Sequence, residues 1–142
     1  MTAGKDNLRI AAEWASKAEN DLRNAAHTLK LGAAGPIDTI CFHAQQCVEK
    51  YLKAMLASGG IEFARTHDIE ELVKLLPTSL NLKLSPSEQA ILTDYATTTR
   101  YPGDYEPISL TEAKAAVAMA RRVRKQIRKL LPNEALKPIK GK

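Results

Sequence analysis

One stretch of this chain limits its fold more than any other. Over residues 37–56, apolar side chains fall at positions 37, 40, 41, 44, 47, 48, 51, 52 and 55. Steps of three and four residues are typical of an α-helix with one buried face. We expect the opposite face, with Gln46, Glu49 and Lys53, to meet solvent. Phe42 lies on that polar face, where it either contacts a partner or sister subunit or is incidentally exposed.

Other stretches have helical patterns too, and together they predict an all-α fold. Residues 6–31 and 110–130 each carry an apolar stripe, and a short helix is expected up to residue 76. Capping boxes at residues 85–88 (SPSE) and 109–112 (SLTE) open two helices. No segment alternates with period two, so we expect an up-and-down bundle of four or five helices. The bundle should span residues 1–132, followed by a basic, flexible tail over residues 133–142.

The charge balance of the chain is basic. The 142 residues suit a single domain, and the formal net charge is +5 with a pI of about 9.3. Such a balance suits an anionic partner without requiring one. The second half of the last helix carries a run of six cationic residues: Arg121, Arg122, Arg124, Lys125, Arg128 and Lys129. We expect their spacing to spread charge around the helix, as either a solvated surface or a surface for RNA or another polyanion.

The two cysteines and the lack of long apolar runs bear on location. Cys41 and Cys47 both belong to the apolar arc and are six residues apart. That is about 9 Å of helical rise, too far for a disulfide, so we expect free thiols in a reducing compartment. No run approaches the roughly 18 apolar residues of a membrane span, and the first residues lack a signal-peptide core. We therefore expect a cytoplasmic protein with no membrane contact.

Familiar catalytic and metal-binding motifs are absent from the sequence. There is no glycine-rich phosphate loop, no paired-cysteine motif and no His-Glu-x-x-His. His27, His43 and His67 fall on different elements, so we expect neither a metal nor a cofactor. His43 flanks the apolar arc on the side of Lys50, as an interhelical hydrogen-bonding group or as the polar wall of a groove. His67 follows Thr66 in a turn, where it has either a capping or a ligand-binding role.

The irregular stretch over residues 97–107 is the strongest candidate for a binding site. It contains Arg100, Tyr101 and Tyr105 around a Pro-Gly turn. A guanidinium matches phosphate or carboxylate geometry, and a tyrosine ring can stack on a base. The alternative is a structural loop whose arginine pairs with a nearby acid such as Asp94.

Three motifs in this chain resemble those of one family. Residues 41–54, CFHAQQCVEKYLKA, resemble the FHAQQAxEKxLKA helix of HEPN domains (higher eukaryotes and prokaryotes nucleotide-binding). Residues 66–69, THDI, resemble the family's THDL turn, and residues 99–105, TRYPGDY, resemble its TRYPxxY loop. The match runs from about Glu13 to about Leu130, most of the chain.

The resemblance implies a helical bundle that usually dimerises. It also implies pairing with a separate minimal nucleotidyltransferase, often in a toxin–antitoxin or stress system. Some relatives are metal-independent ribonucleases that use an Arg and a His separated by four to six residues, and that His opens the last helix. In such a pair, the Arg stabilises the charge on the reacting phosphate and the His moves protons.

This chain departs from that ribonuclease pattern. Arg100 is followed, after four residues, by Tyr105 rather than His. A tyrosine titrates near 10 and is a poor base at neutral pH, although it can hydrogen-bond a phosphate. Arg23 and His27 are separated by only three residues, and Arg65 and His67 by one. Both pairs are too close together to fit the pattern.

We therefore expect a non-catalytic, homodimeric HEPN protein that binds a nucleotide or RNA, or docks a nucleotidyltransferase. The predicted ligand-binding residues are His43, Gln46, Lys50, His67, Arg100, Tyr101 and Tyr105. The alternative is a divergent ribonuclease toxin in which Arg100 and Tyr105 are catalytic, and a third reading is a pure scaffold.

Overall fold

Five α-helices make up the described part of the chain. The computed structural model describes residues 4–97 and 107–137. Helix α1 (Lys5–Leu29) is followed by the 3-10 helix η1 (Gly32–Ala34) and by α2 (Ile37–Ser58). Two short helices, α3 (Ile69–Leu75) and α4 (Pro86–Thr97), precede the long α5 (Leu110–Leu130) and the 3-10 helix η2 (Asn133–Ala135). No β-strand occurs in these residues, so the predicted all-α fold is confirmed.

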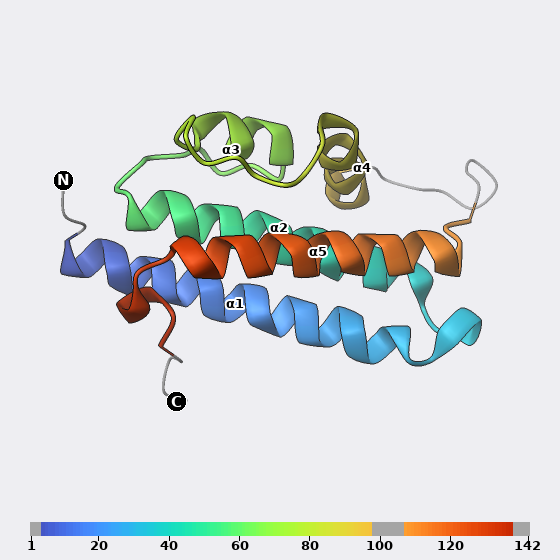
Figure 1. Cartoon of the computed structure of the whole chain (residues 1–142). Coiled ribbons are helices and arrows are strands. Elements are labelled where there is room, and N and C mark those ends of the chain that lie inside the picture. The colour runs from blue at the N-terminus through green and yellow to red at the C-terminus, as the bar shows by residue number, and fades with distance from the viewer. Residues whose placement is uncertain (1–3, 98–106, 138–142) are drawn as a thin grey trace.

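The three long helices lie side by side, and α3 and α4 cover them on one side (Figure 1). Helix α2 runs antiparallel to α1. Helix α5 runs in the same direction as α2, because α3 and α4 carry the chain back across the bundle. The start of α1 therefore lies near the end of α5, where η2 packs against α1.

Helix α2 is the centre of the bundle, and it contacts each of the other four α-helices. The apolar arc predicted from its sequence is buried, including Ala44 and Val48. The expectation that its polar face meets solvent is wrong, because α3, α4 and the loop before α3 cover that face as well. Gln46, Glu49 and Lys53 are only 8%, 2% and 6% exposed.

Phe42 is the apolar residue of α2 that remains outside the core. It is 41% exposed, and its ring meets the His43 ring edge-on with the centroids 5.5 Å apart. No contact in the described residues shows what would cover it, so partner contact remains a prediction.

Small residues dominate the face that α1 presents to α2. Ala11, Ala15, Ala18 and Ala25 are buried, whereas Ile10 is exposed. Alanine side chains at these positions let the axes of the two helices approach closely.

Most helix ends follow the expected local chemistry. Ser85 and Glu88 cap each other reciprocally at 2.9 and 3.2 Å, and the Ser109 hydroxyl accepts from the Glu112 N–H at 3.1 Å. Helix α2 ends before Gly59 and Gly60, and Gly60 adopts a φ of 69° that favours glycine.

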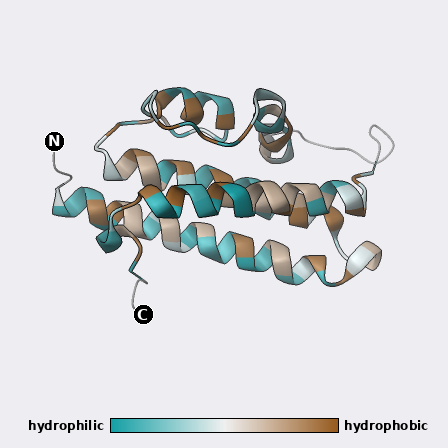
Figure 2. Cartoon of the chain, viewed as in Figure 1, coloured by the Kyte–Doolittle hydropathy of each residue, from teal (hydrophilic) through white to brown (hydrophobic). Residues whose placement is uncertain are grey.

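Two further expectations can be compared with the fold. Cys41 and Cys47 are both buried and are not joined by a disulfide, as predicted. Residues 133–136, by contrast, do not form the expected flexible tail: Ala135 is buried and Leu136 packs against the core. Figure 2 shows that hydrophilic residues gather in the C-terminal half of α5, while its first half is more apolar.

Candidate functional site

Two of the predicted binding residues, His43 and Lys50, share one carboxylate. His43 Nδ1 donates to Asp21 Oδ1 at 2.8 Å, and Lys50 Nζ donates to Asp21 Oδ2 at 2.6 Å. Asp21 is a buried residue of α1, so this cluster joins α1 to α2. Two turns separate His43 from Lys50, which places both side chains on the α1 side of α2. Their described partners are therefore interhelical.

Glu49 is the centre of a second, separate cluster. Its carboxylate accepts from Gln45 Nε2, Lys53 Nζ and His67 Nδ1, each at 2.9 Å. Burial disfavours its charge, but the hydrogen bonds from Gln45, Lys53 and His67 outweigh burial and lower the pKa of Glu49. The cluster ties the loop before α3 to the core.

Of the remaining predicted residues, two lie in this cluster and three lie outside the described residues. Gln46 donates to Gln45 at 2.7 Å and is buried, whereas His67 is 59% exposed. Arg100, Tyr101 and Tyr105 fall in residues 98–106, outside the described residues. The structure thus places His43 with Lys50 and Gln46 with His67, in two groups that share no hydrogen-bond partner.

A third cluster joins α1, α2 and α5 and was not predicted. Arg124 donates through Nε and Nη2 to the two oxygens of Glu19 at 2.7 and 2.9 Å, and the Tyr51 hydroxyl also donates to Glu19. Arg128 Nη1 donates to the Tyr51 oxygen at 3.2 Å. Burial opposes the charge of Glu19, but these donors lower its pKa, so the carboxylate is ionised at neutral pH.

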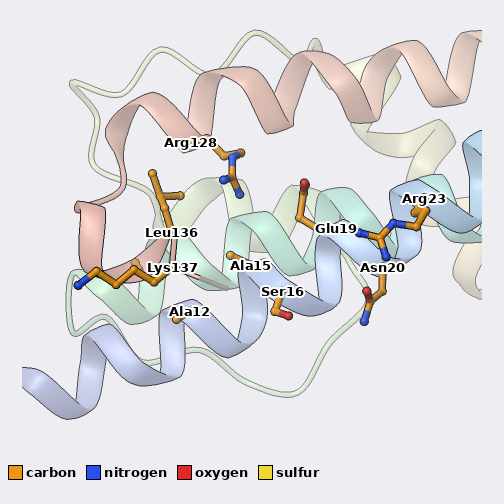
Figure 3. Close-up of a pocket in the computed structure, with 10 residues that line it drawn as sticks. Ala12, Ala15, Ser16, Glu19, Asn20, Arg23, Arg128, Leu136 and Lys137 are labelled. Atoms are coloured by element: carbon orange, nitrogen blue, oxygen red, sulfur yellow. The ribbon is translucent and has the colours of Figure 1, made fainter. Parts of the chain in front are cut away.

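A cationic groove runs over this third cluster, between α1 and α5. Two adjoining cavities of about 510 and 220 Å³ form it, and both are lined by Glu19 and Arg23. Figure 3 shows Glu19 on α1 and Arg128 on α5 facing the space between the helices, with Leu136 and Lys137 at one end. Six cationic residues line the groove: Arg23, Arg121, Arg124, Lys125, Arg128 and Lys137. Glu19 is the one acidic residue among the described lining residues.

Most of this positive charge is uncompensated. Arg124 is paired with Glu19, but Arg23, Arg121 and Lys125 have no ion-pair partner in the part of the chain that the structure describes. All three are exposed. The groove is therefore suited to bind an anion.

The spacing of the cationic residues on α5 contains a signal for the groove. Positions 121, 124, 125 and 128 are spaced by three, one and three residues, which places them on one side of a helix. The expectation that charge is spread around α5 is wrong for these four residues. Arg122 does face elsewhere, toward Glu88 of α4 at 2.9 Å. The contribution of Glu19 and Arg23 depends on how α1 packs, which spacing on α5 does not reveal.

The described residues offer little for nucleophilic or metal chemistry. Burial raises the pKa of the Cys47 thiol, and burial together with the bond to Glu19 raises the pKa of Tyr51, so both groups stay protonated at neutral pH. No three His, Cys, Asp or Glu side chains in residues 4–97 and 107–137 gather as metal ligands. Among the described helices, none combines the length and apolar character needed to cross a bilayer.

Comparison with known proteins gives two matches and one negative result. The HEPN domain family matches residues 11–130 of the chain. The crystal structure of an archaeal HEPN homologue is similar, with a TM-score of 0.64 and 25% sequence identity over 86% of this chain and 98% of that one. None of the curated proteins matches.

Proposed function

Since this chain belongs to the HEPN domain family, we propose that it binds a nucleotide or RNA without cleaving it. The observation that carries this proposal is the start of α5, where relatives with ribonuclease activity are expected to place a histidine. Here the N-cap is Ser109, and its hydroxyl accepts from the Glu112 N–H at 3.1 Å. The three histidines of the chain all precede α4, at positions 27, 43 and 67.

In this proposal, His43 and His67 do not replace the histidine that ribonuclease relatives are expected to place at the start of the last helix. His43 is held by Asp21 and His67 by Glu49, in separate clusters on α2. Neither cluster includes an arginine among its described partners. This arrangement supports binding over cleavage.

In this proposal, Arg100, Tyr101 and Tyr105 provide phosphate and base contacts, with His43, Gln46, Lys50 and His67 as additional ligand-binding residues. The protein acts as a cytoplasmic homodimer. It docks a minimal nucleotidyltransferase, as part of a toxin–antitoxin-like or stress system. The family resemblance supports this pairing, and the exposed Phe42 supports a protein contact.

An RNA cleavage assay tests the proposal against the ribonuclease alternative. Purified protein is incubated with labelled RNA, and Arg100→Ala is compared with Arg65→Ala as a matched arginine control on an exposed loop. We expect no cleavage by any of the three proteins. Cleavage that disappears only in Arg100→Ala would replace the binding role with a divergent ribonuclease that uses Arg100 and Tyr105.

A second measurement tests the binding role itself. A ligand at 100 times its dissociation constant stabilises the folded state by about 2.7 kcal/mol. We expect nucleotides or RNA to raise the melting temperature of the wild-type protein. If neither ligand raises the melting temperature, the protein acts as a scaffold. Its one remaining proposed interaction is then with a nucleotidyltransferase, which co-purification tests.

A further inference from the structure

We propose that the groove between α1 and α5 binds the sugar-phosphate backbone of a single nucleic-acid strand without reading its bases. This inference deepens the proposed RNA-binding function by assigning it a second surface, separate from residues 98–106. It rests on the shape of the groove, on its unpaired charges and on the kinds of side chain that line it.

The groove is continuous along one side of α1. The residues of α1 that line it recur at intervals of three and four, from Ala12 through Glu19 to Ala26. Fourteen residues of helix rise about 21 Å. A base-stacked strand rises about 3.4 Å per phosphate, so at most roughly six phosphates lie along that length, and fewer in an extended strand. The site therefore fits an extended polyanion better than one phosphate.

The cations along the groove are available to such a ligand. Arg23, Arg121 and Lys125 are exposed and have no acidic partner among the described residues. Arg128 has one described hydrogen bond, to Tyr51, and a guanidinium has five N–H donors. An arginine fork pairs with two phosphate oxygens at once. Four side chains can thus contact phosphates without breaking an ion pair.

The groove provides nothing that reads or stacks bases. None of its described lining residues is aromatic, and the apolar part of its wall consists of alanines and leucines. Tyr51 lies beneath Glu19 but has no exposed surface. Proteins that select bases in single strands stack them on aromatic rings. Binding here is therefore expected to depend on charge and length and not on base composition.

Glu19 divides the groove into two parts. It is common to both cavities, and its carboxylate, which Arg124 holds, disfavours a phosphate placed directly beside it. Arg121 and Lys125 line one cavity, Arg128 and Lys137 line the other, and Arg23 lines both. A flexible single strand can place its phosphates on both sides of this carboxylate. A stiff duplex cannot follow a recess between two helices, which favours the single strand.

Fluorescence anisotropy with a labelled 12-nucleotide oligouridylate tests the inference. For single strands, each neutralised phosphate contributes about 0.7 to the slope of log K against log salt. Four contacts predict a slope of about −2.8, or about a 50-fold loss of affinity from 50 to 200 mM salt. The variant Arg121→Ala/Lys125→Ala should reduce the slope by about 1.4 and weaken binding about 25-fold at 0.1 M salt.

The matched control removes the same charge elsewhere. Lys74→Ala/Lys83→Ala changes two exposed cations outside the groove, and it should bind as the wild type does. Melting curves of both double variants show that each is folded. A mixed-sequence RNA and a single-stranded DNA of equal length should bind within about threefold of oligouridylate, and a duplex or polyglutamate should bind more weakly.

The outcomes separate this inference from the proposed function. If Arg100→Ala abolishes binding and the groove variant binds like the control, the groove inference fails and the proposed function stands. If only the groove variant loses affinity, the groove is the binding surface. Equal binding of polyglutamate would identify an acidic protein as the ligand and overturn the inference, as would failure of the wild-type protein to bind any strand.

Discussion

The buried ion pair between Glu49 and Lys53 allows a sharp test of what holds α2 in place. Both side chains are almost fully buried, and their nitrogen and oxygen atoms are 2.9 Å apart. Replacing Glu49 by Gln preserves the shape of the side chain but leaves the Lys53 ammonium without a counter-charge. Removal of one partner of a buried pair typically destabilises a protein by about 3–5 kcal/mol.

The surroundings of Lys53 place the expected value at the lower end of this range. Its ammonium lies 5.1 Å from the centre of the Trp14 ring and 5.9 Å from that of Phe63. Such cation–π contacts each contribute about 0.5–2 kcal/mol and persist in the variant. We therefore expect Glu49→Gln to lower the free energy of unfolding by about 3 kcal/mol. For a chain of 142 residues, that is a fall of about 10 °C in melting temperature.

Urea denaturation followed by circular dichroism measures this effect, and the chain offers a matched control. Glu13 pairs with Arg9 at 3.2 Å with the same spacing of four residues, but both side chains are exposed. Glu13→Gln should change stability by less than about 0.5 kcal/mol. If Glu49→Gln costs as little as Glu13→Gln, the buried pair contributes nothing net and the reasoning is refuted.

Three further predictions concern charge and reactivity. The pKa values of Glu49 and Glu19 are lowered in the folded state, so their contribution to stability is present above the unfolded value of about 4.3 and is lost as the pH falls through the folded values. The urea concentration at the unfolding midpoint, measured from pH 7 to pH 3, should decrease once the pH is below about 5, and it should decrease less steeply in Glu49→Gln. An unchanged profile in the variant would contradict this assignment. Glu19→Gln removes the carboxylate that divides the α1–α5 groove, and it should tighten oligouridylate binding several-fold at 50 mM salt in the anisotropy assay, whereas weaker binding would mean that Glu19 serves to position Arg124. Cys41 and Cys47 are buried and burial raises the pKa of the Cys47 thiol, so a thiol reagent should modify them only at the rate at which the protein opens; rapid labelling of native protein at pH 8 would show that the core is open.

The helices were predictable because their periodicity is strong. The stripe on α2 and the capping boxes at Ser85 and Ser109 all follow from local chemistry that needs no tertiary context. The burial of Gln46, Glu49 and Lys53 was not predictable in this way, because a helix pattern does not say how many neighbours a helix has. Helix α2 has four neighbouring helices. Its second buried face can be polar because Glu49 accepts hydrogen bonds from Gln45 and Lys53 of the same helix.

The candidate site was less accessible to sequence reasoning than the fold. The spacing of Arg121, Arg124 and Lys125 places them on one side of α5, which the expectation of charge spread around the helix missed. Glu19 and Arg23 join these residues only after α1 and α5 pack side by side, across about a hundred residues of chain. The alanines of α1 contributed to this difficulty, because small side chains give a weak apolar signal even where they form most of an interface.

The alanine face of α1 has a consequence for how the protein assembles. Its buried contacts are mainly with α2, the next long helix in the chain, so this hairpin can form while the remainder is still being synthesised. At that stage Glu19 and Tyr51 lack both arginines of α5, and the parts of α2 that pack against α3, α4 and α5 are uncovered. Arrival of the last helix would then complete the ion pair and form the basic groove in one step, so a chain that ends before α5 would lack this groove.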